Sequence, residues 1–69
     1  MNKDAVAKRL IYLRGSKSRD EVANAVGIST SALGMYENGE RIPRDEIKIR
    51  LARYYDRSVQ FIFFNKNDT

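Results

Sequence analysis

Apolar residues recur along this chain at helical spacing, in short segments separated by turn-forming residues. In the first segment, Val6, Leu10 and Leu13 fall on one face of a helix that we expect to cover about residues 3–14. Gly15 marks the end of that helix. No segment shows the sustained alternation of apolar and polar residues that predicts a strand. The pattern therefore predicts an all-α protein.

Two shorter segments in the middle of the chain each begin at a serine. Ser18 and Glu21 have the pattern of a capping box, in which the serine hydroxyl accepts the Glu21 N–H and the glutamate side chain bonds back to the Ser18 N–H. Gly27 ends this helix, Ser29 caps the next one, and the pair at 38–39 ends that one. The residues expected to face inward are Val22, Ala23, Val26, Leu33 and Tyr36.

The last two segments complete the predicted core. Pro43 is expected at the first position of a fourth helix, where its missing N–H costs nothing. Ser58 is expected to cap a last short helix. The apolar positions of these two helices are Ile47, Leu51, Ala52, Tyr54 or Tyr55, Val59, Ile62 and Phe63. We therefore expect one compact five-helix domain over residues 1–64, followed by a short polar tail over 65–69.

Length and composition limit the classes of function. The chain has 69 residues, 42% of them hydrophobic, which supports one small core and no separate catalytic or ligand-sensing domain. We therefore expect no small-molecule ligand. Cys and His are both absent, which excludes disulfides and the usual zinc sites, and we expect no cofactor. The longest apolar run, 61–64, is far shorter than the roughly 20 residues that span a membrane, and no signal peptide is recognisable, so we expect a cytoplasmic protein.

The sequence gives little support to an enzyme. It has no His or Cys to act as a general base or nucleophile, and no glycine-rich phosphate loop. Its close acidic pairs, at 20–21 and 45–46, lie in the first turns of predicted helices, where their effect on the helix dipole explains them. We therefore expect a binding protein.

Charge and helix geometry indicate the kind of partner. The net charge of +4 suits a polyanion, and several of the cations flank the middle pair of helices. Residues 27–29 join these two helices by so short a link that they must pack at a steep angle, with small Ala23 and Gly27 where they cross. This is the helix-turn-helix arrangement, in which the second helix projects toward the major groove of DNA.

Three runs at this spacing carry a resemblance to a known family. SRDEVA at 18–23, VGISTSAL at 26–33 and YENGERIP at 36–43 together resemble the Xre/Cro–CI helix-turn-helix family. The flanking segments are similar to the family's first helix and to its last two, so the resemblance covers about residues 6–64. It implies a lambda-repressor-like fold and binding to double-stranded DNA.

The resemblance also implies which residues face base edges: Thr30, Ser31, Gly34 and Met35. Thr30 and Ser31 can donate or accept hydrogen bonds and touch thymine methyl groups, whereas Met35 offers apolar contact only. Gly34 costs roughly 1 kcal/mol relative to alanine inside a helix. Close approach of its backbone to DNA and simple family variation both explain it. Since no Arg, Lys, Asn or Gln precedes Asn38 on this helix, we expect modest base discrimination, with DNA shape and phosphate contacts supplying much of the affinity.

Further contacts implied by the resemblance go to DNA phosphates, from Lys17, Ser18, Arg19, Ser29, Asn38, Arg41 and Arg44. Free N–H groups at the starts of the two middle helices attract an anion, although plain capping also explains both serines there. Arg19 stands where the family often has Gln, and the link between the first two helices is about two residues shorter than usual. Arg14 and Glu37 match a structural ion pair that orients the recognition helix.

Two functions remain in competition. The first is an operator-binding transcriptional regulator, by analogy a small phage or mobile-element repressor, which acts as a homodimer on two half-sites. Its candidate dimer surface is the aromatic cluster of Tyr54, Tyr55, Phe61, Phe63 and Phe64, of which we expect Phe64 and one tyrosine to be free of the core. The alternative is a protein-interaction module that bridges a regulator to polymerase or another partner. The basic flanks argue against it, because the core of a protein interface tends to exclude charge.

Overall fold

The computed structural model describes residues 2–65. Its helices are α1 (Lys3–Arg14), α2 (Arg19–Val26), α3 (Thr30–Glu37), α4 (Asp45–Tyr55) and α5 (Val59–Phe63). No residue in the described range belongs to a strand, so the predicted all-α class is confirmed. None of these helices is both long enough and apolar enough to cross a membrane.

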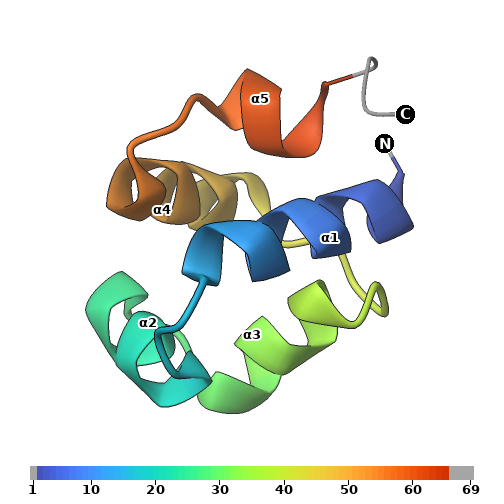
Figure 1. Ribbon diagram of the computed structural model, residues 1–69. Helices are drawn as coiled ribbons and strands as arrows, with labels where there is room; N and C mark the ends of the chain where they lie inside the picture. The colour runs from blue at the N-terminus through green and yellow to red at the C-terminus, as the bar shows by residue number, and fades with distance from the viewer. Residues whose placement is uncertain (1, 66–69) are drawn as a thin grey trace.

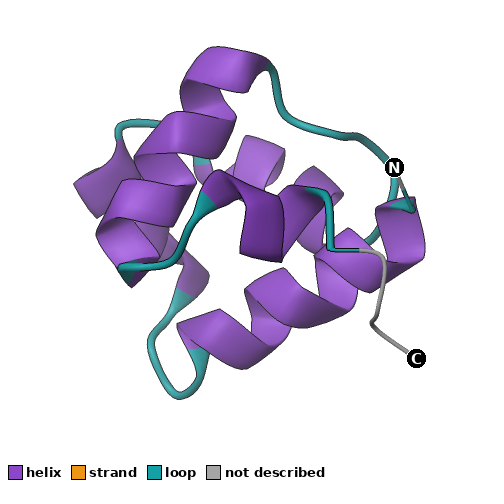
Figure 2. Cartoon of the chain, turned by 90° about the horizontal axis from the view of Figure 1, so that it is seen from above, coloured by secondary structure: helices purple, strands orange, loops and turns teal. Residues whose placement is uncertain are grey.

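The helix α1 runs through the middle of the molecule and has neighbours on both sides (Figure 1). On one side α3 packs against α1, and α2 packs against α3. On the other side α5 packs against α1, and α4 packs against α5 and also reaches α2. Seen from above, the helices cross one another at steep angles, and loops join them (Figure 2). The pair α2–α3 therefore forms one side of a small helical bundle.

Side-chain caps begin most of the helices. The hydroxyls of Ser18, Ser29 and Ser58 each accept the N–H three residues ahead, at 3.1, 3.0 and 3.0 Å, as the sequence predicts. Asn2 caps α1, because its Oδ1 accepts two backbone N–H groups of the first turn. Within the described residues the Glu21 side chain makes no return bond to the Ser18 N–H, so only half of the predicted capping box forms.

The start of α4 differs from the prediction. Asp45 is its first residue and Arg44 its N-cap, so Pro43 lies before the helix and not at its first position. Residues 41–44 follow an irregular path on which Pro43 is buried and Ile42 packs against the core. The fixed φ of proline suits such a connection as well as it suits a helix start, and here burial of the ring decides between them.

The core lies between α1 and the other helices. Its buried hydrophobic residues are Val6, Ala7, Leu10, Val22, Ala23, Val26, Leu33, Tyr36, Ile47, Leu51, Ala52, Tyr55, Ile62 and Phe63. They include every inward position predicted for α2 and α3. Of the two candidate tyrosines of α4, Tyr55 is buried and Tyr54 is only partly so. Leu13 and Val59, also predicted to face inward, are partly buried against the edge of the core.

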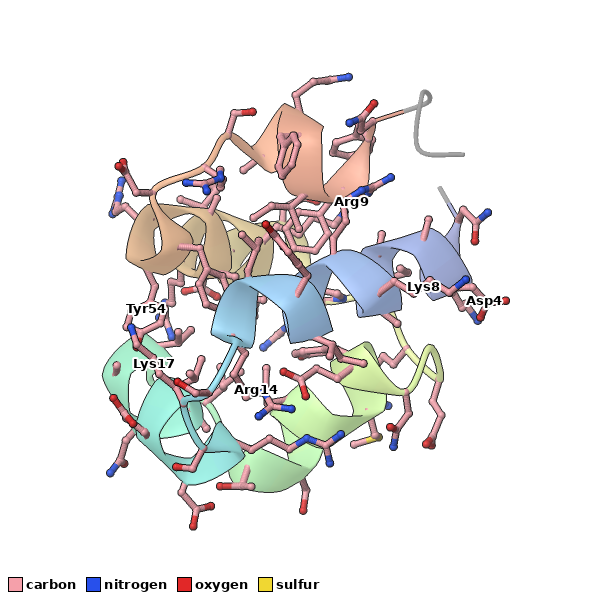
Figure 3. All side chains as sticks on the ribbon, in the orientation of Figure 1. Asp4, Lys8, Arg9, Arg14, Lys17 and Tyr54 are labelled. Atoms are coloured by element: carbon pink, nitrogen blue, oxygen red, sulfur yellow. The ribbon has the colours of Figure 1, made fainter. Side chains whose placement is uncertain are left out.

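Arg9 ties α1 to the end of α5. Its guanidinium donates to the backbone carbonyls of Ile62 and Asn65, the latter at 3.1 Å (Figure 3). Carbonyls near the end of a helix lack donors within the helix, so the arginine supplies them from a distant part of the chain. The predicted polar tail at 65–69 lies outside the described residues apart from Asn65.

Candidate nucleic-acid interface

The turn between α2 and α3 fixes how the second helix leaves the first. Gly27 has φ +85°, a left-handed conformation that costs glycine little and most other residues more. Two consecutive backbone N–H groups, those of Gly27 and Ile28, donate to the Ala23 carbonyl at 2.9 and 3.0 Å and close the end of α2. Ser29 then caps α3 directly. The tight link that the sequence predicts is therefore present.

The helix α3 has a buried side and an exposed side. Leu33 and Tyr36 are buried in the core, which fixes the rotation of the helix about its axis. Thr30 and Ser31 are exposed in its first turn, and Met35 is half-exposed one turn later. The amino-terminal half of α3 thus presents small polar side chains to the outside.

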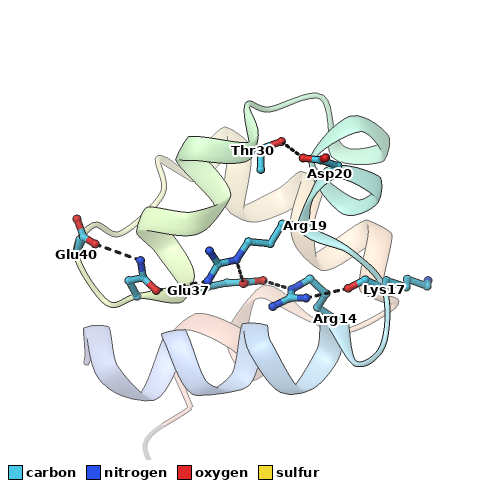
Figure 4. Close-up of polar contacts among 8 residues, drawn as sticks. Arg14, Lys17, Arg19, Asp20, Thr30, Glu37 and Glu40 are labelled. Carbon is cyan, nitrogen blue, oxygen red and sulfur yellow. Dashed lines mark hydrogen bonds and ion pairs between the residues drawn. The ribbon is translucent and has the colours of Figure 1, made fainter.

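The carboxyl-terminal end of α3 is held by a buried carboxylate between two arginines. Glu37 Oε2 accepts from Arg14 Nε of α1, and Glu37 Oε1 accepts from Arg19 Nε of α2, both at 2.8 Å (Figure 4). The Glu37 side chain is 0% exposed, whereas those of Arg14 and Arg19 are 19% and 39% exposed. The hydrogen bond with Glu37 raises the pKa of Arg14. Since charge-assisted bonds satisfy both oxygens, the burial of Glu37 is compensated and three helices meet at one carboxylate.

Arg19 explains the glycine inside α3. A Cβ built on Gly34 would lie 3.4 Å from Arg19 Nη1, so the guanidinium rests on the helix where a larger side chain would stand. Gly34 itself is buried, so a close approach of its backbone to DNA would require the Arg19 guanidinium to move aside. The Arg19 Nη2 group also lies 3.5 Å from Asn38 Oδ1, a weak contact at the end of α3. The Nε donor of Arg19 is therefore committed to Glu37, while the side chain remains 39% exposed.

Thr30, at the first position of α3, is bonded to α2. Its Oγ1 donates to Asp20 Oδ1 at 2.7 Å, and both side chains are exposed (Figure 4). Sequence reasoning missed this contact, because the position of Asp20 in the first turn of α2 already has a local explanation. The helix-turn-helix resemblance could have predicted it, because that arrangement brings the start of α3 close to the start of α2.

Lys17 is directed to α4. Its Nζ lies 5.0 Å from the centre of the Tyr54 ring and 3.3 Å from the Tyr54 hydroxyl (Figure 3). A cation over an aromatic face gains energy from the ring's negative surface. Of the other predicted phosphate ligands, Ser18 and Arg19 stand at the start of α2, Ser29 and Asn38 at the two ends of α3, and Arg41 and Arg44 in the link to α4. Asn38 donates to Glu40 at 3.3 Å, while Arg41 and Arg44 are exposed and have no ion pair within residues 2–65.

Tyr55 is a buried polar group that the sequence placed either in the core or in the candidate dimer surface. Its hydroxyl has no hydrogen-bond partner among the described residues. Burial, and then the negative charge of Glu37, raise the pKa of Tyr55 from 10.0 to about 12. The hydroxyl is therefore an uncompensated polar atom on the core side of the Glu37 cluster.

The geometry defines a class: a helix-turn-helix domain whose second helix, α3, has one buried side and one exposed side. A helix-turn-helix family model (HTH_3) matches residues 6–62, which is most of the chain. The chain belongs to this family, of the Xre/Cro–CI type, whose members are DNA-binding transcription regulators and not generally enzymes. No curated protein and no solved structure matches the chain.

Proposed function

We propose that this chain is a transcriptional repressor that places α3 in the major groove of an operator. The observation that carries the proposal is the asymmetry of α3. Its exposed first turn presents Thr30 and Ser31, and its last turn is locked to two other helices through Glu37. A recognition helix requires both features. Its exposed end must extend to the base edges, and its other end must fix the angle of the helix.

Base contacts in this proposal come from Thr30, Ser31 and Met35. Gly34 stays in this group as a position where the backbone would approach DNA closely once the Arg19 guanidinium moves aside. These side chains discriminate bases only modestly, since none of them makes a bidentate contact.

Phosphates would hold the domain in register on DNA. The capped starts of α2 and α3, at Ser18 and Ser29, present backbone N–H groups to an anion. Arg41 and Arg44 add exposed charges in the loop that follows α3. We retain Asn38 and the exposed part of the Arg19 guanidinium among the proposed phosphate contacts. Lys17 is also kept in this group, and its contacts with Tyr54 favour a weaker phosphate contact than those of Arg41 and Arg44.

A homodimer would supply the second half-site. Phe61 and Phe64 of α5 are each 41% exposed, and Ile49 of α4 is 47% exposed. Phe63 and Tyr55 belong to the core and are not available for such an interface. The side chains offered to a partner are therefore those of Phe61, Phe64 and Ile49, with two-fold symmetry relating the copies.

The test is selection of bound sequences from random double-stranded DNA by the purified chain, at two salt concentrations. We expect an enriched motif with two-fold symmetry. Replacing Arg41 or Arg44 with alanine should weaken binding to all sequences and lower the salt slope by about 1 for each phosphate that is no longer neutralised. Lys8→Ala, which removes the same charge from α1, is the matched control and should leave affinity nearly unchanged. Absence of any enriched motif, together with binding that ignores both arginines, would favour the protein-interaction module instead.

A further inference from the structure

The exposed pair of Thr30 and Asp20 stands at the start of the recognition helix. The Thr30 hydroxyl donates to Asp20 Oδ1 at 2.7 Å, the short distance typical of a bond to a charged oxygen. A carboxylate at neutral pH has acceptors only, so the proton of this bond comes from the threonine. The hydroxyl proton is thereby fixed toward α2, and the free lone pairs of the oxygen remain for an outside group.

No other residue in the described part of the chain forms a hydrogen bond or an ion pair with either side chain. Ser29 already caps α3, so the Thr30 hydroxyl is not needed for that purpose. Asp20 has no cation within ion-pair distance among residues 2–65. The pair therefore presents hydrogen-bond acceptors and a negative charge to the outside. Binding of a phosphate at this place would require a positive charge.

We propose that Asp20 sets the polarity of the Thr30 hydroxyl, so that the pair selects a base carrying an amino group. In the major groove, adenine N6 and cytosine N4 donate hydrogen bonds, whereas guanine O6 and N7 and thymine O4 accept them. A threonine with a free hydroxyl can serve either kind of base by rotation. A threonine whose proton is held by a carboxylate accepts only, so adenine or cytosine is selected over guanine or thymine at the contacted nucleotide. This inference rests on the proposed position of α3 in the groove.

The two effects of Asp20 are separable. Its charge repels the phosphates of any DNA, which lowers affinity for all sequences alike. Its bond to Thr30 changes only the preference among bases. An experiment that measures affinity and preference independently therefore distinguishes a specificity-determining aspartate from an incidental surface charge.

The experiment compares the full chain with Asp20→Asn, which keeps the shape and removes the charge. After selection from random DNA, affinities are measured for four operators that differ only at the nucleotide facing Thr30. The wild-type chain should prefer adenine or cytosine by about tenfold, the size of one base contact. With Asn at position 20 the amide can donate to Thr30, the hydroxyl can turn outward, and the preference should fall to about twofold or less while overall affinity rises. Glu21→Gln removes the same charge one residue away and should raise affinity without altering the preference.

A second background shows whether the aspartate acts through the threonine. In Thr30→Val, which keeps the shape and loses the hydroxyl, Asp20→Asn should change affinity and leave base preference unaltered. An undiminished Asp20→Asn effect on preference in that background, or its absence in the wild-type background, would overturn the proposal. A wild-type preference for guanine or thymine at this position would overturn it as well. Failure of the wild-type chain to enrich any motif would instead defeat the proposed function, and with it this inference.

Discussion

The two ends of α3 are built on opposite principles. At the carboxyl-terminal end, Glu37 is fully buried and two guanidinium groups from other helices hold it. At the amino-terminal end, Thr30 is exposed and shares one hydrogen bond with an exposed aspartate. The carboxyl-terminal end fixes the position of the helix, and the amino-terminal end provides its exposed surface. One eight-residue helix can thus be fixed rigidly while its outer side chains stay free to change.

This division has an energetic reason. A buried charge that loses its partners is costly, so the Glu37 cluster tolerates few substitutions. An exposed polar pair is already solvated, so its loss leaves stability nearly unchanged. We therefore expect substitutions at the two ends to separate cleanly into effects on folding and effects on DNA.

The largest effect is expected from Glu37→Gln. The amide can satisfy only one arginine and carries no charge, so the free energy of unfolding should fall by about 2–4 kcal/mol, below the full cost of breaking a buried pair because both arginines reach solvent. Thr30→Val at the other end should change it by less than about 0.5 kcal/mol. Chemical denaturation of both variants measures this difference. Equal losses would show that the two ends of α3 are not built differently.

A smaller effect separates the two arginines. Arg14 is the more buried partner, so Arg14→Met should cost about 1–2 kcal/mol of unfolding free energy. Arg19 is more exposed, and Arg19→Met should cost at most about 1 kcal/mol. Urea titrations at low and high salt provide the comparison. A greater loss of unfolding free energy for Arg19→Met would mean that the packing of the guanidinium against Gly34 contributes more to stability than the exposure of Arg19 suggests.

Tyr55→Phe should stabilise the chain by up to about 1 kcal/mol, because it removes a buried hydroxyl without a partner. The raised pKa of Tyr55 adds a dependence on pH. Between pH 10.0 and about 12 the unfolded chain releases this proton before the folded chain does, so that contribution to stability falls as pH rises. Thermal unfolding across this range should show a steeper decline for the wild type than for Tyr55→Phe. Parallel declines would contradict the assigned burial.

The smallest net change is expected from Gly34→Ala. Alanine gains up to about 1 kcal/mol in helix propensity, but its Cβ would lie 3.4 Å from Arg19 Nη1, so a small displacement of the guanidinium should offset part of that gain. In an Arg19→Met background the displacement disappears and the full gain should emerge. A double-mutant cycle of unfolding free energies measures the coupling. Additive effects would mean that Arg19 does not depend on the glycine.

The sequence predicted the helix ends well, because local chemistry determines them. Ser18, Ser29 and Ser58 cap helices through bonds to residues three positions away, and such bonds need no knowledge of the fold. Pro43 was assigned wrongly, since a proline suits both a helix start and the extended link before one. Only the packing of residues 41–44 against the core separates these two possibilities.

Contacts between helices were harder to predict. The bond between Thr30 and Asp20 joins a residue assigned to base contact with one explained by its place in the first turn of α2, so neither local pattern linked the two. Likewise the space above Gly34 is filled not by its own helix but by the Arg19 guanidinium of α2. These contacts depend on the angle between α2 and α3, which a family resemblance implies in outline but not at the level of single atoms.

The packing of the Arg19 guanidinium against Gly34 has a consequence for how the outer surface of α3 can evolve. A larger residue at 34 would add a side chain beside the exposed turn of α3, yet it meets the guanidinium already there. Substitution at 34 by a residue larger than alanine is therefore coupled to the residue at 19, because a shorter side chain at 19 leaves more room beside α3. Among homologues, the two positions should covary, with glycine accompanying arginine and larger residues accompanying smaller ones. With α3 in the groove as proposed, large side chains at 34 are therefore expected together with short ones at 19.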